Sequence, residues 1–159
     1  MRGCDVDLPV TTDFHVTVFE AIPSPVFVVD REFSIIDFNA AAAKLPDPIV
    51  FTALRPRGGE ALRCVNAEAA GCGNSPACRE CGIRNTMKEA LVGGYVCRRA
   101  VRMRLRRDGK NVEEVDFLVT AAPFRDGSEP LVLLILEDLD EIVRLRNRAR
   151  AQAVRLGTS

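Results

Sequence analysis

Three strand-like segments near the end of the chain constrain its fold more than any other feature. Residues 95–106 alternate apolar and basic side chains, and Asp108-Gly109 is a typical hairpin turn before a returning strand at 112–124. The continuous apolar run 131–136 suits a third strand that is buried on both sides. The apolar face of the first strand consists of Val101, Met103 and Leu105. Three consecutive strands after a helical middle predict an α+β domain built on one antiparallel sheet.

The N-terminal part predicts two further strands between short helices. Residues 26–30 and 33–38 are strands joined by a tight turn, and Asn39 can cap a helix over 40–45 that ends at the prolines beyond it. A helix is also expected from residue 12 to 22, ended by Pro23-Ser24-Pro25. Residues 55–59 are expected to form a loop, in which Gly58-Gly59 is only a turn. Its inner face would be Phe14, Val18, Phe19 and Ile22.

Four of the six cysteines fall within eighteen residues, at Cys64, Cys72, Cys78 and Cys81. Glycines between them let the backbone bend sharply, and the C-x-x-C pair can chelate one metal from a single turn. Two more thiolates would complete a site for zinc or for an iron–sulfur cluster, with the cluster slightly preferred. We therefore expect the four sulfur atoms to converge on a single ion or cluster. A helix predicted over 83–92 would offer its N-terminal N–H groups to Cys78 and Cys81.

Other interpretations of these cysteines stay open. The four could form two disulfides, or they could be unlinked, half-buried thiols. A reactive dithiol enzyme is not expected, because that chemistry prefers a parallel strand before the pair, and no paired carboxylates or Ser-His-Asp set is visible. Cys4 is expected to lie in a loose lead-in, Cys97 to fill the core or an edge, and His15, the only histidine, to be a surface or packing residue.

Composition sets limits on partners and location. A length of 159 residues predicts one domain, and a formal net charge of zero implies no general attraction to nucleic acid or to a membrane. No apolar run is long enough to span a bilayer, and the N-terminus lacks the apolar core of a signal peptide. These features predict a cytoplasmic protein with reduced thiols.

The C-terminal segment 137–156 predicts a helix rich in arginine. Apolar residues recur in it at nearly heptad spacing, which favours pairing with a second copy of the chain. These seam residues are Leu139, Ile142, Leu145 and Ala149. A solvated, unpaired helix is the alternative.

The order of elements and three short segments carry a resemblance. Residues 19–30, 36–42 and 135–140, with Asn39 after the second strand as the best marker, are similar to a PAS sensory domain over roughly 14–140. The resemblance implies a five-stranded antiparallel sheet with helices on one face, an N-terminal helix and a C-terminal exit helix. It also implies the sensing of a ligand, redox state or light. The cysteine stretch is similar to cysteine-bearing PAS segments of bacterial sensor kinases, and the single histidine argues against haem.

The expected organisation is a lead-in at 1–10, a PAS-like domain at 11–138 with the four-cysteine insert at 64–81, and an exit helix at 139–159. The predicted function is a redox- or metal-responsive sensor that acts in a homodimer on a histidine kinase or another output module. The alternative is an interaction or dimerisation domain with a purely structural zinc or no cofactor. The chain would be a stand-alone sensor or a piece of a larger receptor.

Overall fold

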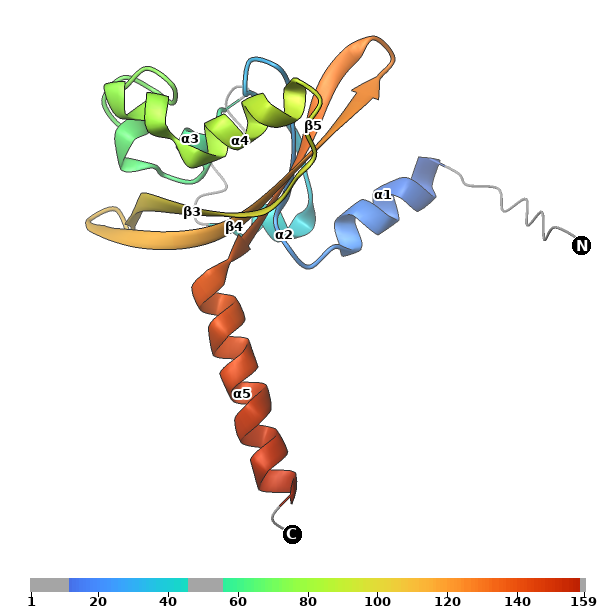
Figure 1. Ribbon diagram of the computed structural model, residues 1–159, viewed down its shortest axis with the longest axis vertical. Coiled ribbons are helices and arrows are strands. Elements are labelled where there is room, and N and C mark those ends of the chain that lie inside the picture. The colour runs from blue at the N-terminus through green and yellow to red at the C-terminus, as the bar shows by residue number, and fades with distance from the viewer. Residues whose placement is uncertain (1–11, 46–55, 158–159) are drawn as a thin grey trace, which may run out of the picture.

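A computed structural model describes residues 12–45 and 56–157. A five-stranded sheet in the order β2-β1-β5-β4-β3 forms its centre, and every neighbouring pair of strands is antiparallel (Figure 1). The sheet confirms the predicted fold class. The helices are α1 (Thr12–Ala21), α2 (Ala40–Ala43), α3 (Gly58–Ala61), α4 (Gly82–Leu91) and α5 (Leu139–Gly157), with the short 3-10 helices η2 (Val65–Ala67) and η3 (Pro76–Glu80). The strands are β1 (Val26–Val29), β2 (Ile35–Phe38), β3 (Val96–Arg107), β4 (Asn111–Asp126) and β5 (Glu129–Asp138).

The β3–β4 hairpin is the longest part of the sheet. Asp108 and Gly109 at its turn have φ angles of 50° and 70°, which matches the two left-handed positions of a type I′ turn. Arg102 lies opposite Asp116 and donates two hydrogen bonds of 2.7 and 2.9 Å to its carboxylate. The predicted turn and the predicted alternation of β3 are therefore confirmed.

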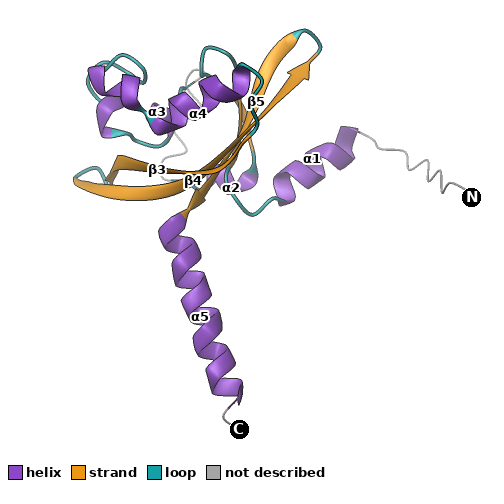
Figure 2. Ribbon diagram, viewed as in Figure 1, coloured by secondary structure: helices purple, strands orange, loops and turns teal. Residues whose placement is uncertain are grey.

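Helix α4, η3 and the cysteine stretch cover one face of the sheet (Figure 2). The inner face of α4 consists of Ile83, Thr86, Met87 and Ala90, all buried. Gly82 begins this helix directly against Val101 of β3, where a Cβ atom would lie 2.7 Å from a valine methyl carbon. Glycine is needed here because it lets the helix start so close to the sheet.

One expectation about β5 needs correction. Leu134 and Leu136 face the covered side and are buried, but Leu133 and Ile135 on the other side are only half-buried. The strand is central in the sheet, and an apolar run alone does not show whether both faces are covered.

Asn39 joins the N-terminal elements and is 1% exposed. Its Oδ1 accepts hydrogen bonds from the N–H groups of Val26 and Ala42, each at 3.0 Å, so it caps α2 as predicted. Its Nδ2 donates to three carbonyl groups between the end of α1 and the start of β1. Every polar atom of this side chain is satisfied, which fixes α1, β1 and α2 to one another.

Two other sequence expectations differ from the structure. The segment expected to be a loop around 55–59 contains the short helix α3, because the Glu60 carboxylate accepts the Arg57 N–H at 2.9 Å and stabilises its first turn. The expected inner face of α1 is wrong for Phe14 and Val18, which are 56% and 48% exposed because α1 projects away from the sheet (Figure 1). The expected lead-in at 1–10 with Cys4, and the prolines expected to end α2, lie outside the described residues.

Helix α5 follows β5 without an intervening loop and extends away from the domain (Figure 1). Asp138, the last residue of β5, accepts the N–H groups of Asp140 and Glu141 at 2.9 and 3.1 Å and so caps the first turn of the helix. None of its residues with described side chains is buried. Among the described helices, none is both long enough and apolar enough to cross a membrane.

Candidate thiol site

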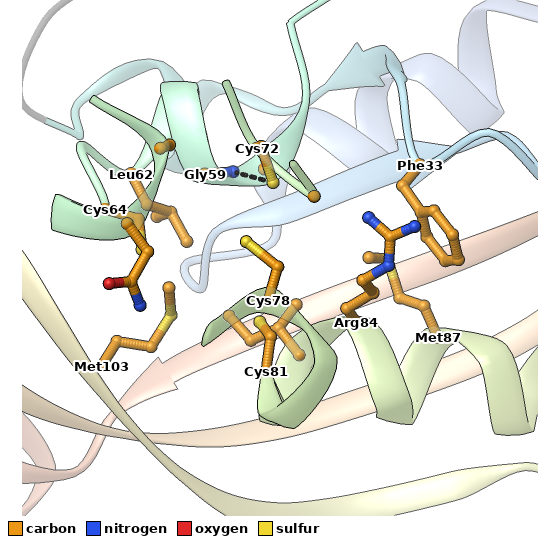
Figure 3. A pocket seen from close by; sticks show the side chains of 15 residues that line it. Phe33, Gly59, Leu62, Cys64, Cys72, Cys78, Cys81, Arg84, Met87 and Met103 are labelled. Carbon is orange, nitrogen blue, oxygen red and sulfur yellow. Dashed lines mark hydrogen bonds between the residues drawn. The ribbon is translucent and has the colours of Figure 1, made fainter. Parts of the chain in front are cut away.

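All four clustered cysteines line a single cavity of about 40 Å³ between α4 and the α3–η2 segment. Figure 3 shows Cys64 and Cys72 on one side and Cys78 and Cys81 on the other, with the Cys72 and Cys78 side chains pointing toward each other. Most of the remaining lining is apolar, including Leu62, Ile83, Met87 and Met103. The sequence segment therefore folds into one sulfur-lined cavity.

Cys64 is held against the sheet. It follows Arg63, whose φ is 57°, and forms an isolated antiparallel bridge with Leu105 of β3. The Arg106 N–H donates to the Arg63 carbonyl at 2.9 Å, and the Arg106 guanidinium forms an ion pair with Glu68. These contacts tie the first cysteine to β3.

Cys72 lies between Gly71 and Gly73, whose φ angles of 85° and 91° favour glycine. Its N–H donates to the Glu60 carboxylate at 2.6 Å, while its carbonyl accepts Nη1 of Arg57 at 2.9 Å. Its Sγ accepts the Gly59 N–H at 3.3 Å, the dashed line in Figure 3. Helix α3 therefore positions the second cysteine through backbone and side-chain contacts.

Cys78 and Cys81 come from the approach to α4, as the sequence predicted. Cys78 is 8% exposed within η3. The N-cap of η3 is Ser75, whose hydroxyl accepts the Ala77 N–H at 3.3 Å. Cys81 is the N-cap residue of α4, and its carbonyl accepts the Asn85 N–H at 2.9 Å. Both thiols thus lie where the helix dipole favours negative charge.

Burial raises the pKa of the Cys64 and Cys72 thiols, and neighbouring cysteines raise it further. Backbone N–H groups, including that of Gly59 toward Cys72, oppose this effect only in part. In the absence of a bound cation, these two thiols are therefore neutral at pH 7. A cation bound among them would displace their protons.

Within residues 12–45 and 56–157, no three cysteine, histidine or carboxylate side chains already lie in an arrangement that could hold one ion. The five cysteines of this part are all free thiols. The four in the cavity surround a space that has room for more than one water-sized atom. Four soft sulfur donors, with no carboxylate among the described lining residues, are of the chemical type that suits zinc or an iron–sulfur cluster.

The sequence analysis missed several residues of the site. Gly59 was interpreted only as part of a turn, yet it donates to Cys72, and a Cβ atom there would lie 2.7 Å from Sγ. Arg84, which is the one charged residue in the described lining of the cavity, was also missed. Arg84 follows Cys81 by three residues, and this spacing could have placed Arg84 and Cys81 on one face of α4.

The remaining candidate residues lie elsewhere. His15 is exposed on α1 and makes an edge contact with the Phe14 ring. Cys97 is exposed on the edge strand β3, next to a bulge at Arg98, whose φ is 51°. Neither residue is among those that line the cavity.

Part of the chain is similar to a known protein family. Residues 14–45 match the family model for the PAS domain. Among solved structures, a PAS domain from a two-component sensor histidine kinase aligns with a TM-score of 0.46 and 8% identity over 79% of this chain and 94% of its own. The PAS domain of BvgS from Bordetella pertussis aligns with a TM-score of 0.44 and 17% identity over 87% and 92%. No curated protein matches the chain.

The family match covers the N-terminal part of the domain. It includes Asn39 and α2, and the sheet has the five antiparallel strands that the resemblance implied. Residues 14–45 of the chain are therefore similar to a PAS domain.

Proposed function

We propose that this chain is a redox- or metal-responsive sensor. In this proposal Cys64, Cys72, Cys78 and Cys81 hold an iron–sulfur cluster, which is slightly preferred, or zinc. The observation that carries the proposal is that four cysteines from separate local elements line one cavity. Bound there, the group would supply a reversible change in charge or an oxidisable metal–thiolate bond.

The same contacts support a route from the cavity to the sheet. Cys81 is the N-cap residue of α4, and the first residue of the helix, Gly82, packs directly on Val101 of β3. Cys64 bridges Leu105 of the same strand. A change in the thiol site would thus reach β3 from two sides, through α4 and through the bridge.

The proposed output is α5, which continues β5 and contacts β4. Its seam residues Leu139 and Ile142 are half-buried, whereas Leu145 is 55% exposed and Ala149 is exposed within the chain. Pairing with a second copy would cover this stripe. A histidine kinase or another signalling module is the partner class that we propose for the output.

Anaerobic purification tests the proposal directly. The sample should contain iron and sulfide with visible absorption, or one zinc per chain, and replacement of all four cavity cysteines by alanine should abolish either. Cys97→Ala is the matched control, because this cysteine is exposed and outside the cavity. A wild-type sample without iron or zinc, before and after anaerobic reconstitution, would refute the thiol-site function.

A second function is an interaction or dimerisation domain with a structural zinc or no cofactor. The exposed apolar residues of α1 and α5 favour this alternative, since an exposed apolar stripe is typical of a helix that pairs. Zinc removal would then loosen the cysteine stretch regardless of redox state. A midpoint potential within the cellular range would favour the sensor.

A further inference from the structure

A positive charge with one buried nitrogen atom lies beside the thiols. The half-buried Arg84 extends from the first turn of α4 into the cysteine cavity, and no other residue in the described lining is charged. Its Nη1 is fully buried and has no hydrogen-bond partner within the described part of the chain. A buried donor without an acceptor is costly, and a buried charge without an opposite charge is more so.

The local structure fixes Arg84 in this position. Its guanidinium stacks on the Phe33 ring, with Cζ 4.6 Å from the ring centroid. Gly73, the residue after Cys72, leaves space for it: a Cβ atom there would lie 2.0 Å from Nη1. Any side chain at Gly73 would displace the guanidinium, so the cysteine loop is shaped around this charge.

The described ion pairs leave this charge without a protein partner. None of the salt bridges in the described residues includes Arg84, and Glu60, the carboxylate near Cys72, is already bonded to the N–H groups of Arg57 and Cys72. Stacking on Phe33 stabilises the face of the guanidinium but leaves Nη1 unsatisfied.

We infer that Arg84 is the counter-charge of a negatively charged, thiolate-held group in the cysteine cavity, an inference that rests on the proposed function. Four thiolates around a doubly positive ion or cluster carry a net charge of about −2. A fixed guanidinium beside them offsets part of that charge in a low-dielectric environment. Two disulfides or four neutral thiols carry no charge and would leave the guanidinium unpaired. The inference therefore distinguishes a bound, negatively charged group from both of these states.

The test uses the full chain with Arg84→Met, which keeps an unbranched apolar stem, Arg84→Lys, which keeps the charge, and Arg79→Met as a control. Arg79 has the same charge and lies between Cys78 and Cys81, but it is exposed. We expect Arg84→Met to bind zinc about 10-fold to 100-fold more weakly in a competition assay, the range typical of residues that support metal ligands. Arg84→Lys should recover part of this loss, and Arg79→Met should match the wild type.

If the group is a cluster, its midpoint potential gives an independent measurement. Loss of a nearby positive charge makes reduction harder, so Arg84→Met should shift the potential downward, by about 59 mV for each tenfold change in the one-electron equilibrium. A merely structural role would leave the potential unchanged, and an unchanged potential together with unchanged zinc affinity would overturn the inference.

Thermal melting of the reduced, metal-free protein separates this inference from the proposed function. Because Arg84→Met removes a charge whose buried Nη1 has no partner in the described residues, its Tm should equal or exceed that of the wild type without metal and fall below it with metal bound. If the wild type binds neither zinc nor a cluster, the proposed function fails. The comparison of the two metal-free proteins still tests the role of Arg84. A Tm of Arg84→Met that equals or exceeds that of the wild type supports the inference that the guanidinium requires an anion. A lower Tm overturns this inference.

Discussion

The closest packing in the site predicts a sharp difference between two adjacent glycines. A Cβ atom on Gly59 would lie 2.7 Å from Sγ of Cys72, 2.8 Å from its Cβ and 3.2 Å from the Ala67 Cβ. No described atom lies within 4 Å of a Cβ atom on Gly58. Favourable contacts between carbon atoms begin at about 3.5 Å, so Gly59→Ala forces Cys72 to move and Gly58→Ala does not.

The magnitude follows from two opposing effects. Replacing a helical glycine by alanine stabilises a protein by about 0.5–1 kcal/mol, and this effect applies to both positions in α3. Overpacking a buried site costs about 1–3 kcal/mol, and this effect applies to Gly59 alone. Gly59→Ala should therefore lower the free energy of unfolding by up to about 2 kcal/mol, while Gly58→Ala should leave it unchanged or raise it.

Thermal melting of the reduced, metal-free variants measures the packing effect, with a shift of about 3 °C expected for each kcal/mol in a domain of this size. Metal or cluster content after anaerobic reconstitution measures the effect on the site. Gly59→Ala should lose content because Cys72 is displaced, and Gly58→Ala should retain it. Equal stability and equal content in the two variants would refute the reasoning.

Three further predictions concern other parts of the molecule. Asn39→Ala should lower the free energy of unfolding by about 3–4 kcal/mol in a chemical denaturation experiment, because it removes every hydrogen bond that the two donors and two acceptor positions of this buried amide make. The reduced, metal-free protein should lose stability as pH rises above about 8.5, because the raised pKa values of Cys64 and Cys72 make the folded state hold protons that the unfolded chain releases. Leu145→Glu should shift the particle mass from dimer toward monomer in light scattering, because it places a charge in the proposed seam.

Each of these predictions has a matched control. Asn85→Ala removes one exposed hydrogen bond and should cost less than about 1 kcal/mol, so an equal loss would contradict the role assigned to Asn39. Replacement of both Cys64 and Cys72 by serine should flatten the dependence of stability on pH between pH 8 and 10. An unchanged slope would show that other groups cause this dependence. Asn147→Glu, an exposed polar position on α5, should leave the mass unchanged.

The fold was largely predictable because its signals are local. Alternation in β3, the Asp108-Gly109 turn and the capping ability of Asn39 each depend on a few neighbouring residues, and each is confirmed. The errors concern long-range packing. Nothing within α1 shows that Phe14 stays exposed, and nothing within β5 shows that Leu133 is only half-buried, because both depend on which surfaces other elements cover.

The candidate site was predictable in its cysteines but not in its surroundings. The spacing of the cysteines identified the four thiols. The helix after Cys81 was also expected, so the place of Cys78 and Cys81 near its N-terminus could be predicted. Gly59 and Arg84 line the cavity only because the fold brings their segments together. Gly59 lies in a segment that the sequence predicted to be a loop, and Arg84 lies at a helix position that belongs to no known motif. The identity of a metal or cluster stays a prediction, since thiolate ligands suit several.

The direct junction between β5 and α5 has a mechanical consequence. A helix of 19 residues is about 28 Å long, and its base is the capped end of a strand in the middle of the sheet. A tilt of roughly 5° at that base would move the far end by about 2.5 Å, half of a helical turn. A small change in sheet twist would therefore displace the far end of α5 by enough to alter how two such helices pack.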